Sequence, residues 1–132
     1  MKAKNPATDC GAQLIIVEDD LVSSYAMSLM LEDHGCHVLE NLVSADNIVE
    51  DVKSLQPDAI LMDIRLSGEM DGTQAAIALR KKDNVPIVFI SAFNDEATKS
   101  TIDAISNSML VNKPYEIRHV VDAIYDLIRT KN

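Results

Sequence analysis

The sequence has few of the residues that mark secreted, zinc-binding and membrane proteins. It contains no tryptophan and only two cysteines, Cys10 and Cys36. Two cysteines cannot build a disulfide-rich scaffold, and their separation does not match a zinc site, so we expect two free thiols in a reducing cytosol rather than a disulfide. No apolar run approaches the ~18 residues of a membrane-spanning helix, and the apolar residues behind the N-terminal lysines are too few for a signal peptide.

Positive charge is scarce as well. The chain has 12 lysines and arginines against 21 aspartates and glutamates, which gives a net charge of -9. A protein that binds nucleic acid or an anionic membrane needs a basic face to neutralise phosphates, so we predict neither as a partner. The composition, 132 residues of which 47% are apolar, is that of one globular cytoplasmic domain. We place this domain at residues 13–130, after an N-terminal tail at residues 1–12.

Short apolar runs alternate with helical patterns five times along the chain. Helix starts are indicated by Asp20, Ser44, Asn94 and Pro114. Strands without polar interruptions, separated by helices, are typical of a parallel sheet covered on both faces. The sequence therefore predicts an α/β fold, a doubly wound five-stranded parallel sheet with five helices. The strands are expected at 13–17, 37–43, 58–62, 85–91 and 108–112, and the helices at 21–34, 44–56, 71–82, 94–106 and 114–130.

Reactive side chains follow several of these strands. Glu18 and Asp19 come after the first strand, Asp63 after the third, Ser91 ends the fourth and Lys113 follows the fifth. In doubly wound sheets, chemistry takes place at the carboxyl ends of the strands. If the strand order is 2-1-3-4-5, the first and third strands are neighbours, and their three carboxylates share one crevice.

Carboxylates gathered in this way need a partner. Two unit charges about 4 Å apart repel by about 4 kcal/mol at an effective dielectric of 20. The cluster must therefore bind a cation, or one of its members must hold a proton. Oxygen ligands with open positions suit Mg²⁺. Lys113 can supply a positive charge to an anion at the same edge, and Ser91 can supply a hydroxyl donor.

Four segments, each at a strand end, together resemble the response regulator receiver domain of two-component signalling. They are "LIIVEDD" at 14–20, "DAILMDIRL" at 58–66, "PIVFISA" at 86–92 and "NKPY" at 112–115. The resemblance covers roughly residues 13 to 130 and implies the flavodoxin-like, CheY-like fold with strand order 2-1-3-4-5. It also implies that Asp63 accepts a phosphoryl group from a histidine kinase or a histidine phosphotransfer protein, in a step that requires Mg²⁺.

The resemblance also implies a role for each residue of the pocket. Mg²⁺ would be held by Asp19 and Asp63, by Glu18 through water, and by the backbone carbonyl of Arg65. Ser91 would hydrogen-bond a phosphoryl oxygen, and Lys113 would neutralise its charge. The Lys113–Pro114 peptide bond is typically cis in the family.

The output implied by the resemblance is protein contact, not catalysis on a substrate. The phosphorylated form would act through the surface of the fourth helix, fifth strand and fifth helix. One departure from the family concerns this step, because Leu110 stands where an aromatic residue often couples the pocket to that surface. The cognate kinase and the target cannot be named from the sequence.

Other functions on the same fold remain open. A phosphohydrolase with an aspartyl nucleophile commonly has a second acid two residues after the first, where this chain has Arg65. A flavin or nucleotide carrier needs a Gly- or Ser/Thr-rich loop after the first strand, and this loop reads "EDDL". A receiver-like adaptor without phosphorylation would not need a complete pocket.

Overall fold

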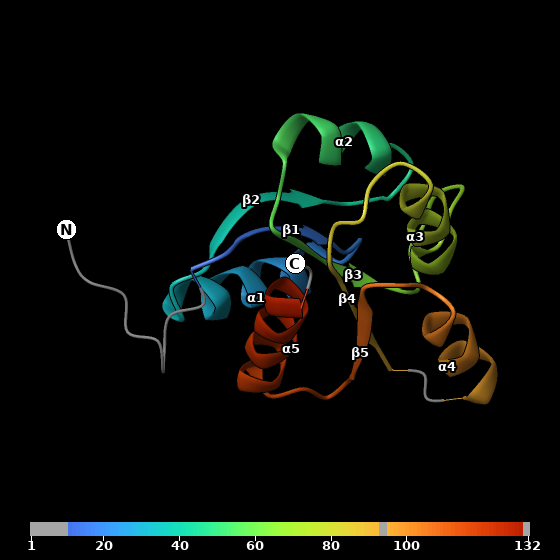
Figure 1. Cartoon of the computed structure of the whole chain (residues 1–132). Helices are drawn as coiled ribbons and strands as arrows, with labels where there is room; N and C mark the ends of the chain where they lie inside the picture. Colours follow the sequence, from blue (N-terminus) through green and yellow to red (C-terminus); the bar gives the residue numbers. More distant parts are fainter. Residues whose placement is uncertain (1–10, 93–94, 131–132) are drawn as a thin grey trace.

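The fold is a single parallel sheet enclosed by helices (Figure 1). The computed structural model describes residues 11–92 and 95–130. The sheet order is β2-β1-β3-β4-β5, and each pair of neighbouring strands is parallel, as predicted. The strands are β1 (Gln13–Val17), β2 (His37–Leu42), β3 (Ala59–Asp63), β4 (Ile87–Ser91) and β5 (Ser108–Asn112).

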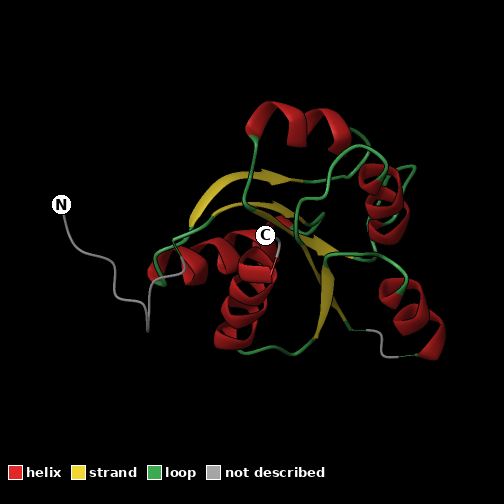
Figure 2. Cartoon of the chain, viewed as in Figure 1, coloured by secondary structure: helices red, strands yellow, loops and turns green. Residues whose placement is uncertain are grey.

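Helices cover both faces of the sheet (Figure 2). The helices are α1 (Leu21–Asp33), α2 (Ile48–Leu55), α3 (Gly72–Arg80), α4 (Glu96–Asp103) and α5 (Ile117–Thr130). α1 and α5 pack on one face, and α2, α3 and α4 pack on the other. Each face buries its own apolar cluster, which explains the unbroken apolar strands in the sequence.

The two clusters take alternate residues of each strand. In β1, Leu14 and Ile16 face α1 and α5, whereas Ile15 and Val17 face the other three helices. These side chains are at most 2% exposed. Full burial of such a side chain contributes about 1.5–3 kcal/mol, so the central strands are the rigid part of the molecule. The functional side chains at their ends are held by this rigidity.

α1 and α3 begin within one residue of the predicted position, and the other three helices begin later. Asp20 caps α1 by accepting a hydrogen bond from the Val22 N–H at 3.1 Å, as expected. α2 begins at Ile48 and not near Ser44, because residues 44–47 form a turn. α5 begins at Ile117 and not at Pro114. The Lys113–Pro114 bond is cis, as the family resemblance implied.

The start of α4 also differs from the prediction. Its N-cap is Asp95, whose carboxylate accepts a hydrogen bond from the Thr98 N–H at 3.2 Å. The predicted cap, Asn94, lies outside the described residues. Both side chains are good caps, so the sequence alone did not distinguish between neighbouring positions.

Cys36 is buried and disulfide-bonded, so the prediction of a free thiol at this position is wrong. Cys10 lies outside the described residues. The sheet register explains why sequence spacing gave no signal: the His37 N–H donates to the Ala12 carbonyl at 2.8 Å. This hydrogen bond places Ala12 beside the residue that follows Cys36, although 24 positions separate Ala12 from Cys36 in the sequence.

α1 has an unusual surface, because its apolar residues are not confined to the buried side. Leu21, Val22, Tyr25 and Leu29 are each between 51% and 79% exposed. Contiguous exposed apolar side chains often mark a protein contact surface. Across the described ranges, none of the helices has both the length and the apolar character needed to cross a membrane.

Candidate functional site

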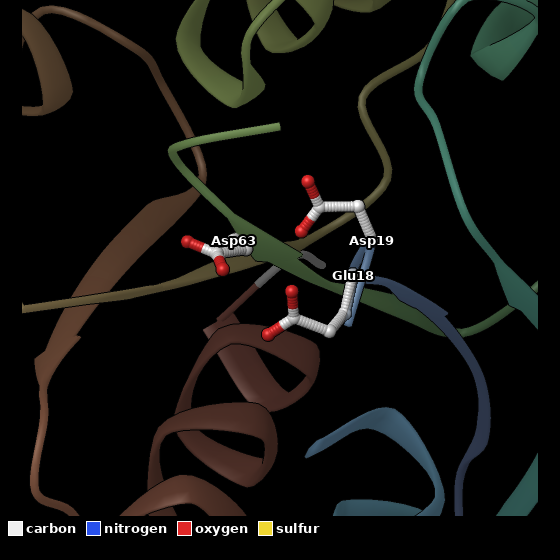
Figure 3. Close-up of side chains that lie close together, drawn as sticks. All are labelled: Glu18, Asp19 and Asp63. Carbon is white, nitrogen blue, oxygen red and sulfur yellow. The ribbon is translucent and has the colours of Figure 1, made fainter. Parts of the chain in front are cut away.

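Three carboxylates meet at the carboxyl edge of the sheet. Glu18 and Asp19 directly follow β1, and Asp63 is the last residue of β3. The two strands are neighbours, with Val17 opposite Met62. One oxygen atom of each carboxylate lies within 4.8 Å of the others, and Figure 3 shows the three groups converging. The strand order thus creates the cluster that the sequence predicted.

Lys113 reaches this cluster from the far side of β4. Its Nζ lies 3.3 Å from Asp63 Oδ2 and 3.7 Å from Glu18 Oε1. Its backbone N–H donates to the Ser91 carbonyl at 2.8 Å, which fixes the root of the side chain to the end of β4. One ammonium group therefore faces two carboxylates, and a net negative charge is left at the site.

The pKa values of Glu18 and Asp19 shift in opposite directions. The pKa of Glu18 is raised from 4.5 to about 7, mainly because the side chain is buried and also because Asp63 lies nearby, although the Asp20 N–H opposes this rise. The pKa of Asp19 is lowered: its slight burial acts upward, but hydrogen bonds with Glu18 and with the Ser67 N–H outweigh it. Burial therefore favours the protonated form of Glu18, whereas Asp19 favours its charged form.

The donor set fits a divalent cation such as Mg²⁺. It consists of carboxylate oxygens, and burial together with the nearby Asp63 raises the pKa of one of these carboxylates, Glu18, to about 7. Hard cations such as Mg²⁺ prefer oxygen ligands and fill their remaining coordination positions with water. Arg65, whose carbonyl was predicted as a further ligand, immediately follows the site: its N–H donates to Asp63 Oδ1 at 3.2 Å, and its side chain is exposed.

Ser91 occupies the end of β4, next to the acidic cluster in the sheet. It is 1% exposed and lies opposite Asn112 of β5 in the register. Asp63 pairs with Ile90, the preceding residue, so the Ser91 side chain belongs to the strand that separates Asp63 from Lys113. The structure thus brings all predicted pocket residues to the ends of adjacent strands.

A cavity of about 360 Å³ adjoins the site between α1 and the loop after β5. Glu18, Asp63 and Lys113 line one side of it, and Met27 and Tyr115 are among the other lining residues. Most of this wall is apolar, which keeps the neighbourhood of Glu18 low in polarity and accounts for its raised pKa.

The loop between β3 and α3 contains features that sequence reasoning missed. Gly72, the first residue of α3, leaves no room for a side chain, because a Cβ there would clash with the Asp63 carbonyl oxygen. Asp46, from the turn before α2, accepts hydrogen bonds from the N–H groups of Glu69 and Met70 at 3.0 and 3.3 Å. Asp46 falls within the helix that the sequence predicts at 44–56, so the residue pattern does not indicate these contacts.

Comparison with known proteins identifies the family. The model of the response regulator receiver domain matches residues 14–125. Transcriptional regulatory protein PdtaR of Mycobacterium tuberculosis is 28% identical over 124 residues, which cover 90% of this chain and 60% of that protein. The protein-glutamate methylesterase/protein-glutamine glutaminase of Halobacterium salinarum is 28% identical over 98 residues, which cover 74% of this chain and 28% of that protein. The chain thus spans less than two thirds of either relative.

Solved structures agree with this family. The signal receiver domain of a modulated diguanylate cyclase from Desulfovibrio desulfuricans has a TM-score of 0.83 at 28% identity, covering 91% of this chain and 95% of that one. The N-terminal domain of a response regulator/sensory box/GGDEF protein from Carboxydothermus hydrogenoformans has a TM-score of 0.78 at 28% identity, covering 90% and 95% respectively.

The chain belongs to the response regulator receiver domain family. It is a signalling module of two-component systems with the CheY-like fold. Receiver domains bind Mg²⁺ through acidic residues and interact with histidine kinases or phosphotransfer proteins.

The protonation of Glu18 predicts a dependence of stability on pH in the metal-free protein. The folded-state pKa lies above the ordinary value, so the contribution is fully present below pH 4.5 and is lost as pH rises through about 7. Allowing for solvent screening, we expect this loss to be about 1–2 kcal/mol. Urea unfolding with EDTA between pH 5 and 8 measures it, and Glu18→Gln should lack this component.

Mg²⁺ should remove the same dependence, because the cation stabilises the charged carboxylate. Parallel pH curves for the wild type and Glu18→Gln in EDTA would contradict the assignment of the proton to Glu18.

Proposed function

We propose that Asp63 is the phosphoacceptor of this receiver domain. The phosphorus–nitrogen bond of a donor phosphohistidine breaks, a phosphorus–oxygen bond forms to an Asp63 carboxylate oxygen, and the donor imidazole leaves with the electron pair. The observation that supports this is the position of Asp63 at the end of a buried strand, 3.3 Å from the Lys113 ammonium and within the acidic cluster. A carboxylate held there needs positioning and charge neutralisation more than chemical activation.

The other pocket residues complete the proposal. Glu18, Asp19, Asp63 and the Arg65 carbonyl would hold Mg²⁺, which when bound supplies positive charge to the phosphoryl oxygens. Lys113 already contacts the acceptor and needs little movement to contact the new phosphoryl group. Ser91, buried at the end of the neighbouring strand, would donate its hydroxyl to another oxygen.

Two alternatives are less well supported. A phosphohydrolase would commonly place an acid two residues beyond Asp63, and this position carries Arg65, an exposed base. An adaptor that never accepts phosphate would not need to gather three carboxylates and an ammonium group, an arrangement that raises the pKa of Glu18. We therefore propose a signalling phosphoacceptor that is not an enzyme acting on a separate substrate.

We propose that the phosphodonor is a protein that contacts α1. The exposed side chains of Leu21, Val22, Tyr25 and Leu29 begin two residues after Asp19 in the chain. A histidine donor must approach this same edge of the sheet, so an apolar face beside it suits a protein partner. We propose further that residues 13–130 form the receiver domain, that residues 1–12 are a tail, and that the domain acts in the cytoplasm without binding nucleic acid or membrane.

Incubation with acetyl phosphate and Mg²⁺ tests the phosphoacceptor directly. We expect the intact mass to rise by one phosphoryl group, and no rise when the metal is chelated. Asp63→Ala should lose the modification, because the nucleophile is gone. Lys113→Ala should slow it by about 10²-fold or more, the range for removing one group that stabilises transition-state charge. Modification that persists in Asp63→Ala would overturn the proposal.

The α1 surface can be tested by changing the donor. Tyr25→Asp should accept phosphoryl groups from acetyl phosphate at the wild-type rate, because Tyr25 does not line the pocket. Transfer from a phosphorylated histidine phosphotransfer domain should be at least tenfold slower, since a charge is placed in an apolar contact. An equal effect with both donors would contradict a docking role for α1.

The output surface is proposed to be that of α4, β5 and α5. The backbone connects it to the pocket, because the Lys113 N–H donates to the Ser91 carbonyl and Ser91 pairs with Asn112. Leu110, which replaces the usual aromatic residue, packs with the cluster under α2, α3 and α4. We infer that coupling in this chain runs along the β4–β5 ladder more than through the side chain at position 110.

Amide NMR spectra before and after phosphorylation test this coupling. We expect shifts at Asn112, Lys113 and the start of α5, and little change in α2. A Leu110→Ala variant should be less stable by about 2 kcal/mol and should retain the shifts at Asn112 and Lys113. Shifts confined to the carboxylates' own neighbours would contradict coupling through the ladder.

A further inference from the structure

The loop that follows Asp63 is held at both ends by packing. At one end Asp63 terminates β3, and at the other the Gly72 N–H donates to the Ile64 carbonyl at 2.7 Å. Leu66 and Met70 pack against the core cluster under α2 and α3. Between these two contacts, Ser67, Gly68 and Glu69 are exposed and have no apolar anchor.

This exposed stretch is tied down by two carboxylates from other loops. Asp19 Oδ2 accepts from the Ser67 N–H at 3.1 Å. Asp46 Oδ1 accepts from the N–H groups of Glu69 and Met70 at 3.0 and 3.3 Å. The proposed function also makes Asp19 a metal ligand, so its carboxylate would contact both the cation and the loop. Asp46 is not one of the proposed metal ligands and, among the described residues of this region, contacts only the loop.

We propose that Asp46 is a positioning residue that holds the β3–α3 loop in its metal-binding conformation. This inference rests on the proposed function, because the proposed Mg²⁺ site uses the carbonyl of Arg65, which lies in this loop, and the carboxylate of Asp19, which the loop contacts. With Asp46 in place, the two N–H groups are satisfied before the cation arrives, and Asp19 does not hold the loop alone. Ordering that precedes binding lowers the cost of binding.

The backbone at Asp46 is itself well fixed. Ala45, on one side, and Ile48, two residues beyond, are fully buried, and the Ile48 N–H donates to the Ala45 carbonyl at 3.1 Å. The carboxylate therefore projects from a rigid turn toward the loop. This also explains why α2 begins only at Ile48: the preceding turn directs Asp46 away from the helix.

Gly68 is adapted to the same contact. Its φ of +105° is a conformation that side chains rarely adopt. A Cβ at this position would lie 2.8 Å from Asp46 Oδ2. The glycine thus allows the loop backbone to approach the carboxylate, and Gly68→Ala should push the two apart from the opposite side.

The test compares four variants with the wild type. Asp46→Ala removes both acceptor bonds, whereas Asp46→Asn keeps the side-chain oxygen and removes the charge. Gly68→Ala displaces the loop. The matched control is Asp58→Ala: this exposed aspartate accepts from the Gln13 N–H at 2.8 Å, at the opposite end of the sheet. Mg²⁺ affinity is measured by calorimetry on folded, metal-free protein, together with amide exchange at Glu69 and Met70.

We expect Asp46→Ala and Gly68→Ala to weaken Mg²⁺ binding by about three- to tenfold, the size expected for exposed hydrogen bonds to a carboxylate. In the metal-free state, amide exchange at Glu69 and Met70 should be faster in these two variants than in the wild type. Asp46→Asn and Asp58→Ala should stay within about twofold of the wild type. Excess Mg²⁺ should restore phosphorylation of Asp46→Ala by acetyl phosphate, because the loss lies in metal affinity and not in the nucleophile.

Two results would overturn the inference. If Asp46→Asn binds Mg²⁺ as weakly as Asp46→Ala, the effect is one of charge and not of loop position. If Asp46→Ala matches the wild type in affinity and exchange, Asp46 holds nothing that the metal requires. Failure of the proposed function looks different: wild-type protein that takes no phosphoryl group refutes the phosphoacceptor role, while affinity and exchange still decide the role of Asp46.

Discussion

Repulsion among three carboxylates at the end of β1 and β3 is the constraint on which the functional part of this structure depends. One oxygen of each of Glu18, Asp19 and Asp63 lies within 4.8 Å of the others, and the Lys113 ammonium faces the carboxylates of Glu18 and Asp63. This arrangement is unfavourable unless a proton or a cation is present. Burial and the nearby Asp63 raise the pKa of Glu18 to about 7, so without a cation the cluster favours a proton on Glu18.

Such a cluster can persist only on a rigid framework. The strands that deliver the acids are buried on both faces, by α1 and α5 on one side and by α2, α3 and α4 on the other. Loops then adjust the geometry: the Gly72 contact closes the β3–α3 loop against Asp63, and Asp19 and Asp46 hold its exposed part. The core supplies stability, and a small number of backbone hydrogen bonds supply the precision that metal binding demands.

The proposed donor and output surfaces lie on different elements of the domain. α1 exposes apolar side chains, and the Lys113 N–H and the Ser91–Asn112 pair connect the end of β4 to the end of β5. Because Leu110 stands where an aromatic residue is usual, we propose that this backbone ladder is the direct connection. A donor and a target could thus contact different sides of one small domain.

The sequence by itself determined the alternation of strands and helices, the acids at strand ends and their chemical character, because apolar periodicity and residue type are local properties. It did not determine where α2 and α5 begin, the bonded state of Cys36 or the role of Asp46. The surroundings of Cys36 and the contacts of Asp46 depend on which distant backbone lies alongside: Ala12 beside His37, and Glu69 beside Asp46. Only the packed sheet brings these segments together, so only the tertiary structure decided that the pKa of Glu18 is raised and that Asp19 and Asp46 contact the β3–α3 loop.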